Sequence, residues 1–272
     1  MKKGVRGLEK LARAIRATVL KNIVGAGGGH TGGSLSSVDI LVALYFHTLR
    51  IDPRRPDWAE RDRFILSKGH SVESYHAVLA ERGFFDKEVL DSYGKFGSIL
   101  AGHPTRKVPG IEINSGALGH GLSVGVGLAL AAKRSGAGYT TYVLTGDGEH
   151  GEGSLMEAAA AAGHYRLDNL VCIVDRNGLQ ISGPTEEVMA IEHLEQKYRA
   201  CGWTVKSCRG NEMQELLETL ESIPFNTGSP SLIIARTTKG KGISFMENRA
   251  GWHHRVPNKE ELQKALEELD RK

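Results

Sequence analysis

Residues 141–177 read TYVLTGDGEHGEGSLMEAAAAAGHYRLDNLVCIVDRN, and they predict one strand–helix–strand unit. The runs 141–145 and 169–175 are apolar enough for buried strands, and the alanine-rich run 154–164 between them is typical of a helix. Two strands joined by a helix of this length pair in parallel. Because these strands are apolar throughout rather than alternating, they fit a sheet that is covered by helices on both faces.

The same alternation continues on either side of this unit. Further strands are predicted at 63–67, 203–208 and 231–237. Helices are predicted at about 8–23, 40–46, 71–82, 119–136, 191–202, 211–223 and from 258 onward, with mostly irregular chain at 84–118. In this interpretation residues 25–33 form a glycine-rich loop, and the glycines within 119–136 mark a helix packed closely on a neighbour. The sequence therefore predicts one α/β domain over residues 1–272, with three layers and a mostly parallel sheet between the helices.

Composition excludes several classes of protein. The chain is 40% hydrophobic and 25% charged, and its net charge of +3 comes from interspersed signs, which is not typical of a nucleic-acid-binding protein. No apolar run is long enough to span a membrane. The three cysteines have no paired spacing, which favours a reducing, cytoplasmic compartment over a disulfide framework or a zinc site. Glycine is in excess, at 34 of 272 residues against a background of about 7%.

One cluster of glycines follows the first strand of the 141–177 unit. Gly146, Gly148 and Gly151 have the GxGxxG spacing of a dinucleotide-binding turn between a strand and a helix. Asp147 argues against that interpretation, because a carboxylate in the turn would repel a pyrophosphate unless a cation lay between them. An NAD-dependent oxidoreductase stays an alternative, in which Asp175 at the end of the next strand would take the ribose.

A divalent metal would resolve this repulsion, and a second ligand is available on the neighbouring strand. Asn177 follows Asp147 by 30 residues, about one strand–helix–strand unit. The Asp147 carboxylate, the Asn177 amide oxygen and a backbone carbonyl near Leu179 supply three hard oxygens. With two diphosphate oxygens and a water they would complete the octahedron that Mg²⁺ prefers. The bare backbone at Gly148 would let the diphosphate approach its N–H group.

A GDG triplet followed by about 28 residues and an asparagine is typical of thiamine diphosphate-binding proteins, and the chain resembles the transketolase family over about residues 8–261. It is most similar to the N-terminal subunit of split, two-chain transketolases. The matching pieces are GGHTGGSLSSVDILVALYF (28–46), RDRFILSKGH (61–70), AGHPT (101–105), GALGHGLSVGVGLALA (116–131), GDGEHGEGSLMEAAAAAGHYRLDNLVCIVDRNGLQISG (146–183) and ARTTKGKGISFMENRAGWHH (235–254).

The resemblance implies a fold of the thiamine diphosphate-binding type and roles for four histidines. His30 and His103 are expected to face the hydroxyls and reacting carbon of the donor ketose, and imidazoles suit this because they exchange protons near neutral pH. His70 and His253 are expected near the cofactor diphosphate, and His253 is also a catalytic candidate. The remaining histidines, His254 and His76 among them, receive no predicted role.

The resemblance also implies further cofactor contacts. The backbone at Gly116 and Leu118 is expected to contact the aminopyrimidine, and Ile181 to pack near the thiazolium. Gly146 and Gly148 belong to the diphosphate turn. Glu152 matches a glutamate that couples cofactor sites across a subunit interface, although a carboxylate favoured by the helix dipole explains it equally well.

The implied activity is transfer of a two-carbon ketol unit from a ketose phosphate to an aldose phosphate, with thiamine diphosphate and Mg²⁺. Family members need an activating glutamate on a pyrimidine-binding domain, and 272 residues leave no room for that domain or the C-terminal domain. We therefore expect both on a partner chain, in an α₂β₂ assembly.

Three further kinds of protein could be built from the same domain. They are the α chain of a 2-oxo acid dehydrogenase, a deoxyxylulose phosphate synthase-like subunit and a non-catalytic cofactor-binding protein. The SKGH (67–70) and AGHPT (101–105) pieces favour transketolase over the first two. The pathway, pentose phosphate metabolism or a specialised sugar route, is left open by the sequence.

Overall fold

Five parallel strands form the centre of the molecule, in a computed structural model that describes residues 4–271. Their order across the sheet is β1-β2-β3-β5-β4, and every neighbouring pair is parallel. The strands are β1 (Arg63–Leu66), β2 (Thr141–Gly146), β3 (Leu170–Arg176), β4 (Thr204–Arg209) and β5 (Ser231–Arg236). All five lie where the apolar runs predict strands.

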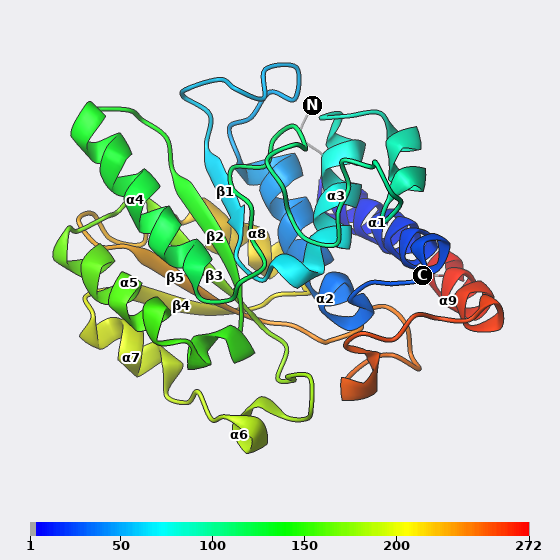
Figure 1. Cartoon of the computed structure of the whole chain (residues 1–272). Helices are drawn as coiled ribbons and strands as arrows, with labels where there is room; N and C mark the ends of the chain where they lie inside the picture. Colours follow the sequence, from blue (N-terminus) through cyan, green and yellow to red (C-terminus); the bar gives the residue numbers. More distant parts are fainter. Residues whose placement is uncertain (1–3, 272) are drawn as a thin grey trace.

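Helices cover both faces of this sheet (Figure 1). One layer consists of α4 (His120–Ser135), α5 (Gly153–His164) and α7 (Leu194–Ala200). The other consists of α1 (Val5–Ala26), α2 (Thr31–Ala43), α3 (Val72–Arg82) and α8 (Met213–Glu221), with α9 (Lys259–Arg271) packed along α1. The short helix α6 (Thr185–Val188), which the sequence pattern does not predict, lies in the connection between β3 and α7. The predicted three-layer α/β fold is confirmed.

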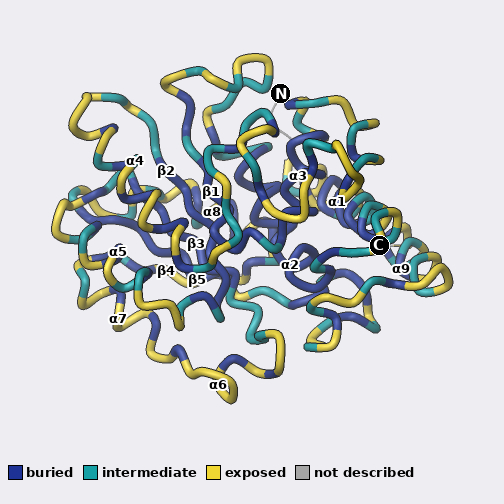
Figure 2. Tube along the Cα trace, in the orientation of Figure 1, coloured by how far each residue is buried: buried dark blue, intermediate teal, exposed yellow. Residues whose placement is uncertain are grey.

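Side chains along each strand alternate between two hydrophobic clusters. Tyr142 and Leu144 of β2 belong to the cluster beneath α1, α2, α3 and α8, whereas Val143 belongs to the cluster beneath α4, α5 and α7. Both clusters are buried, as Figure 2 shows for the central strands. Because each face needs apolar side chains, the central strands β2, β3 and β5 are mainly apolar, whereas the edge strand β4 exposes Lys206 and Ser207.

The start of α2 differs from the prediction. The sequence pattern places residues 25–33 in a loop and begins the helix at residue 40, but α2 begins at Thr31 and includes Gly32 and Gly33. A Cβ atom on Gly32 would lie 2.9 Å from the carbonyl oxygen of Trp252, and one on Gly33 would lie 3.1 Å from Ser71 Oγ. These glycines are therefore helical residues that allow close packing, because tertiary contacts outweigh their low helix propensity.

The loops after the strands gather at one edge of the sheet. Parallel strands all end on the same side, so the residues that follow β1, β2, β3 and β5 lie near one another. Helix α3 follows β1, and the three-residue turn of 3₁₀ helix at Gly69–Ser71 joins them. No helix within residues 4–271 is long and apolar enough to cross a membrane.

Candidate active site

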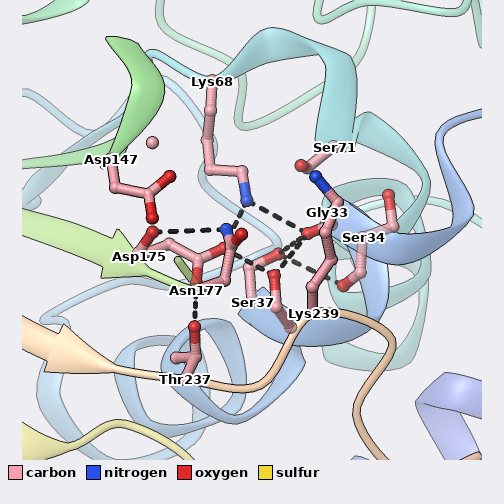
Figure 3. A network of polar contacts seen from close by, with 12 residues as sticks. Gly33, Ser34, Ser37, Lys68, Ser71, Asp147, Asp175, Asn177, Thr237 and Lys239 are labelled. Carbon is pink, nitrogen blue, oxygen red and sulfur yellow. Dashed lines mark hydrogen bonds and ion pairs between the residues drawn. The ribbon is translucent and has the colours of Figure 1, made fainter. Parts of the chain in front are cut away.

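A cavity of about 410 Å³ lies beyond the carboxyl ends of the strands. Four of its lining residues come just after four strands: Lys68 after β1, Asp147 after β2, Asn177 after β3 and Lys239 after β5. Figure 3 shows these four side chains close together. Ligands of open parallel sheets bind at this edge, so the cavity is the candidate site.

Most of the predicted site residues line this cavity. They are His30, His70, Gly116, Leu118, Gly146, Asp147, Gly148, Asn177, Leu179, Ile181 and His253. Ile181 lies with 73% of its surface exposed. The structure thus brings together residues that are far apart in the sequence, while their individual roles stay predictions.

Two predicted residues lie outside the lining of the main cavity. His103 lines a second cavity of about 320 Å³, which shares His30 with the first. A Cβ atom on Gly116 would lie 2.9 Å from Cδ2 of His103, so the loop at Gly116 passes directly against that ring. Glu152 is the N-cap residue of α5 and is exposed, and its coupling role across an interface stays a prediction.

The turn after β2 holds the Asp147 carboxylate almost fully buried, at 2% exposure. Its Oδ1 accepts a hydrogen bond from Gly148 N–H (2.8 Å), and its Oδ2 accepts from Gly178 N–H (2.6 Å) and from Arg176 (3.2 Å). Burial, with a contribution from the nearby Asp175 carboxylate, raises the pKa of Asp147. A divalent cation here would replace the partial neutralisation that Arg176 provides.

The donor set fits the predicted magnesium ion. Asp147, Asn177 and Leu179 all line the cavity and offer a carboxylate, an amide oxygen and a backbone carbonyl. The Leu179 carbonyl accepts a hydrogen bond from Lys239 Nζ (3.1 Å), so this oxygen already faces a cation. Within residues 4–271 no three His, Cys, Asp or Glu side chains converge as a metal centre. The predicted set contains a single carboxylate and depends on ligand oxygens to complete the shell.

Two buried lysines line the cavity, and neither has a role predicted from the sequence. Lys68 is 1% exposed and forms an ion pair with the fully buried Asp175. Lys239 is 2% exposed and its Nζ contacts neutral groups, the Leu179 carbonyl and His253 Nδ1 (2.8 Å). Burial, and then repulsion from Lys68, lower the pKa of Lys239 to about 8. A buried ammonium beside neutral partners favours an anionic ligand.

Glu149 is another residue of the site that the sequence motifs do not single out. It is 2% exposed and accepts hydrogen bonds from Gly146 N–H (2.9 Å), Gly119 N–H (2.9 Å) and Ser67 Oγ. Burial raises the pKa of this carboxyl group. Glu149 therefore fastens the Gly146–Gly148 turn to the loop before α4. Only the position of Glu149 two residues after Asp147 could have indicated this role.

Four histidines surround His30. Its ring centroid lies 5.3 Å from His70, 6.0 Å from His103, 5.7 Å from His253 and 4.5 Å from His254. Burial, followed by the neighbouring His254 and His103, lowers the pKa of His30 to about 4. The four predicted histidines do converge around His30, and His254 lines the second cavity with His30 and His103.

The rings of His30, His70 and His253 are uncharged at neutral pH. Burial is also the main cause that lowers the pKa of His253 to about 3 and that of His70 well below its usual range. A neutral imidazole donates one hydrogen bond and accepts another, which suits it to sugar hydroxyls, and its N–H group can also donate to a phosphate oxygen.

The dinucleotide alternative does not fit this geometry. Asp175, the acid that would hold the ribose, is fully buried. It is paired with Lys68 and accepts hydrogen bonds from Ser36 Oγ (2.6 Å) and Thr237 Oγ1, as Figure 3 shows for the contacts with Lys68 and Thr237. Its oxygens are therefore engaged within the protein.

The fold and the site define an α/β domain with a polar cavity at the ends of its parallel strands. The family model "Transketolase, thiamine diphosphate binding domain" matches residues 8–270, and the chain belongs to the transketolase family.

Named relatives agree with this assignment. The chain is 52% identical to a subunit of the apulose-4-phosphate transketolase of Phocaeicola vulgatus, over 97% of this chain and 94% of that protein. It is 42% identical to "6-deoxy-6-sulfo-D-fructose transketolase subunit SqwG" of Clostridium sp., over 97% and 96% of the two chains. The crystal structure of the Campylobacter jejuni transketolase superposes with a TM-score of 0.93 at 31% identity. This chain is covered to 98% in that superposition and spans 43% of the longer chain.

Proposed function

We propose that this chain is the diphosphate-binding subunit of a two-component transketolase. In this function it would help to transfer a two-carbon ketol unit from a ketose phosphate to an aldose phosphate. The observation that carries the proposal is that two buried lysines, Lys68 and Lys239, line the same cavity as the oxygen donors of Asp147 and Asn177. Cations and oxygen ligands in this arrangement suit a metal-bound diphosphate, and the relatives named above are transketolase subunits.

The residues of the cavity divide between the parts of the proposed cofactor. Lys68, Lys239, His70 and His253 would bind the diphosphate, and Asp147, Asn177 and the Leu179 carbonyl would bind Mg²⁺. Backbone at Gly116 and Leu118 would contact the aminopyrimidine, with Ile181 near the thiazolium. When bound, thiamine diphosphate would supply the carbon nucleophile that the reaction needs.

The histidines would act on the sugar. His30 lines both cavities, and His103 lines the second. Because the pKa of His30 lies near 4, its ring is neutral at pH 7 and would donate to one sugar oxygen while accepting from another. These imidazoles would hold the hydroxyls in place and exchange protons with them.

We also propose a partner subunit that carries the pyrimidine-binding domain and the activating glutamate. The support is that two relatives, matched over 94% and 95% of their own length, are each named as one subunit of a transketolase. An α₂β₂ assembly would place cofactor sites between unlike chains, with Glu152 near an interface. The sugars stay to be assigned, and the names of the relatives make apulose 4-phosphate and 6-deoxy-6-sulfofructose the first ones to test.

The test compares the chain alone with the chain assembled with its partner. Ketol transfer to a panel of aldose phosphates is followed with Mg²⁺ and thiamine diphosphate present. We expect activity in the assembly and none in the isolated chain. Transfer by the isolated chain would overturn the two-component proposal, and an inactive assembly across the whole panel would overturn the transketolase activity itself.

A further inference from the structure

Glu73, in the first turn of α3, is a buried carboxylate that the proposed function does not use. It is 1% exposed. Its Oε1 accepts hydrogen bonds from His30 N–H (2.9 Å) and Tyr93 Oη (2.8 Å), and its Oε2 accepts from Ser34 Oγ (2.6 Å). All three donors are uncharged groups, and no ion pair of Glu73 is found within residues 4–271.

The three donors belong to separate parts of the site. His30 is the N-cap residue of α2, and Ser34 lies in the first turn of that helix. Tyr93 follows the 3₁₀ helix Lys87–Ser92 in the segment after α3. One carboxylate on α3 therefore joins the start of α2 to the loop at Tyr93.

The backbone before His30 also lies against this carboxylate. Gly29 has a φ of +152°, and a Cβ atom there would lie 2.6 Å from Glu73 Oε1. A side chain at residue 29 would therefore displace either the carboxylate or the backbone that leads into His30. The contact between Gly29 and Glu73 therefore fixes the backbone position from which the His30 side chain extends.

The two groups that Glu73 joins are separate parts of the wall of one cavity. His30 and Tyr93 both line the second cavity, together with Ala26, Gly28, Gly29, Gly94, Gly102, His103 and His254. None of these lining residues carries a fixed charge. Imidazoles and bare glycine backbone suit a neutral, hydroxylated chain, such as the body of a sugar phosphate away from its phosphate group.

Burying a carboxylate without a cation costs several kcal/mol unless hydrogen bonds compensate it. Here three donors do so, and the N-terminus of α3 adds a favourable dipole. A neutral or apolar residue would fill the same space at lower cost. A buried carboxylate that takes three donors in defined directions instead fixes the geometry of the groups it binds.

We infer that Glu73 is a positioning residue for sugar recognition: it fixes His30 and Tyr93 at the spacing that the hydroxylated chain of the substrate requires. The inference rests on the proposed transketolase function and deepens it. Glu73 acts through His30 and Tyr93 rather than by touching the sugar.

The test uses the assembled enzyme and three variants, with kcat and KM measured for donor and acceptor sugars and the Kd measured for thiamine diphosphate with Mg²⁺. Glu73→Ala removes both acceptor oxygens and with them all three hydrogen bonds, and we expect KM for the sugar to rise at least about tenfold. Glu73→Gln keeps an acceptor for His30 and Tyr93, so we expect it to restore KM to within about threefold of wild type. The cofactor Kd should change less than about twofold in both.

A third, milder variant keeps the inference falsifiable if Glu73→Ala does not fold. Tyr93→Phe removes one donor without opening a cavity, and we expect a raised KM with an unchanged cofactor Kd. Ser92→Ala is the matched control, because Ser92 Oγ bonds the Val89 carbonyl and Ser98 rather than Glu73.

The outcomes separate the two proposals. An active wild-type assembly whose sugar KM is unchanged by Glu73→Ala or Tyr93→Phe overturns the positioning role alone. A parallel loss of cofactor affinity and sugar affinity, not restored by Glu73→Gln, also overturns it, because that is the result of a merely structural role. A wild-type assembly without ketol transfer overturns both proposals.

Discussion

At the residue scale, the burial of the Lys239 ammonium group beside neutral partners favours the binding of an anionic ligand. Its ammonium lies in the cavity beside a carbonyl and an imidazole, and burial lowers its pKa to about 8. An ammonium group with such neutral partners gains more free energy from binding a diphosphate than an ammonium group that is already paired with a carboxylate. Lys68 is already paired with a carboxylate, that of Asp175.

Replacing Lys239 should therefore weaken diphosphate binding. For Lys239→Met in the assembled enzyme, we expect the Kd for thiamine diphosphate to rise about 10- to 100-fold, since hydrogen bonds to charged groups are worth about 1.5–3 kcal/mol. Binding of thiamine, which lacks the phosphates, should hardly change. Lys241→Met serves as the control because Lys241 is more exposed and lies beside Glu247. Equal Kd values in Lys239→Met and wild type would contradict the assignment.

His76 predicts a pH dependence of stability. It is 1% exposed, neither ring nitrogen has a hydrogen-bond partner among the described residues, and burial lowers its pKa to about 3. Between that value and the usual value of about 6.5 the unfolded chain binds more protons, so stability falls as the pH drops below about 6.5. From pH 7 to pH 5 this one group should remove about 2 kcal/mol from the free energy of unfolding.

Urea denaturation at pH 7 and pH 5 checks this prediction. In His76→Leu the loss of stability between the two pH values should be smaller than in wild type by about 2 kcal/mol. An identical loss in both proteins would show that His76 is not buried in its neutral form.

Sequence and structure agree at the residue scale where the contacts follow from local order. Asp147 and Asn177 could be predicted to lie together at one edge, because each follows an apolar run and parallel strands end at the same edge. Lys68 could not be assigned in this way, since its burial depends on Asp175, which lies 107 positions away. Glu73 depends in the same way on His30, 43 positions away.

Helix α4 illustrates at the element scale why some glycines are required. A Cβ atom on Gly125 would lie 2.5 Å from Val143 Cγ2 of β2, whereas Gly127, on the same helix, has open space around it. The glycines in this segment predicted close packing, and Gly125 confirms it. The start of α2 was harder to predict, because its first turn contains two glycines, which favour loops, at positions where Trp252 and Ser71 leave little room for a side chain.

The two glycines of α4 form a matched pair of variants. Gly125→Ala should destabilise the protein by about 1–3 kcal/mol through overpacking against the sheet. Gly127→Ala should be neutral or stabilising by up to about 1 kcal/mol, because alanine favours the helix. Urea denaturation of both measures the difference. Equal effects of the two substitutions would mean that α4 does not pack on β2 as described.

At the scale of the whole molecule, the fold is built from strands and helices that alternate along the chain. Central strands that are mainly apolar require helices on both faces of the sheet, and the two hydrophobic clusters meet that requirement. The same parallel arrangement places Lys68, Asp147, Asn177 and Lys239 at a single edge. What the pattern could not predict is the second cavity, because its walls come from irregular chain around Tyr93 and His103 and from the loop at His254.

The proposed activity depends most on Asp147, which would bind a metal that holds thiamine diphosphate in this cavity. The most direct measurement is calorimetric titration of thiamine diphosphate into the assembled enzyme, with Mg²⁺ and with a chelator, for wild type and Asp147→Ala. Asp168→Ala is the control, because that aspartate lies near the surface and pairs with Lys133. We expect binding to wild type and to the control only when Mg²⁺ is present, and no Mg²⁺-dependent binding to Asp147→Ala. The same Mg²⁺-dependent affinity in Asp147→Ala as in wild type would contradict the proposed metal site.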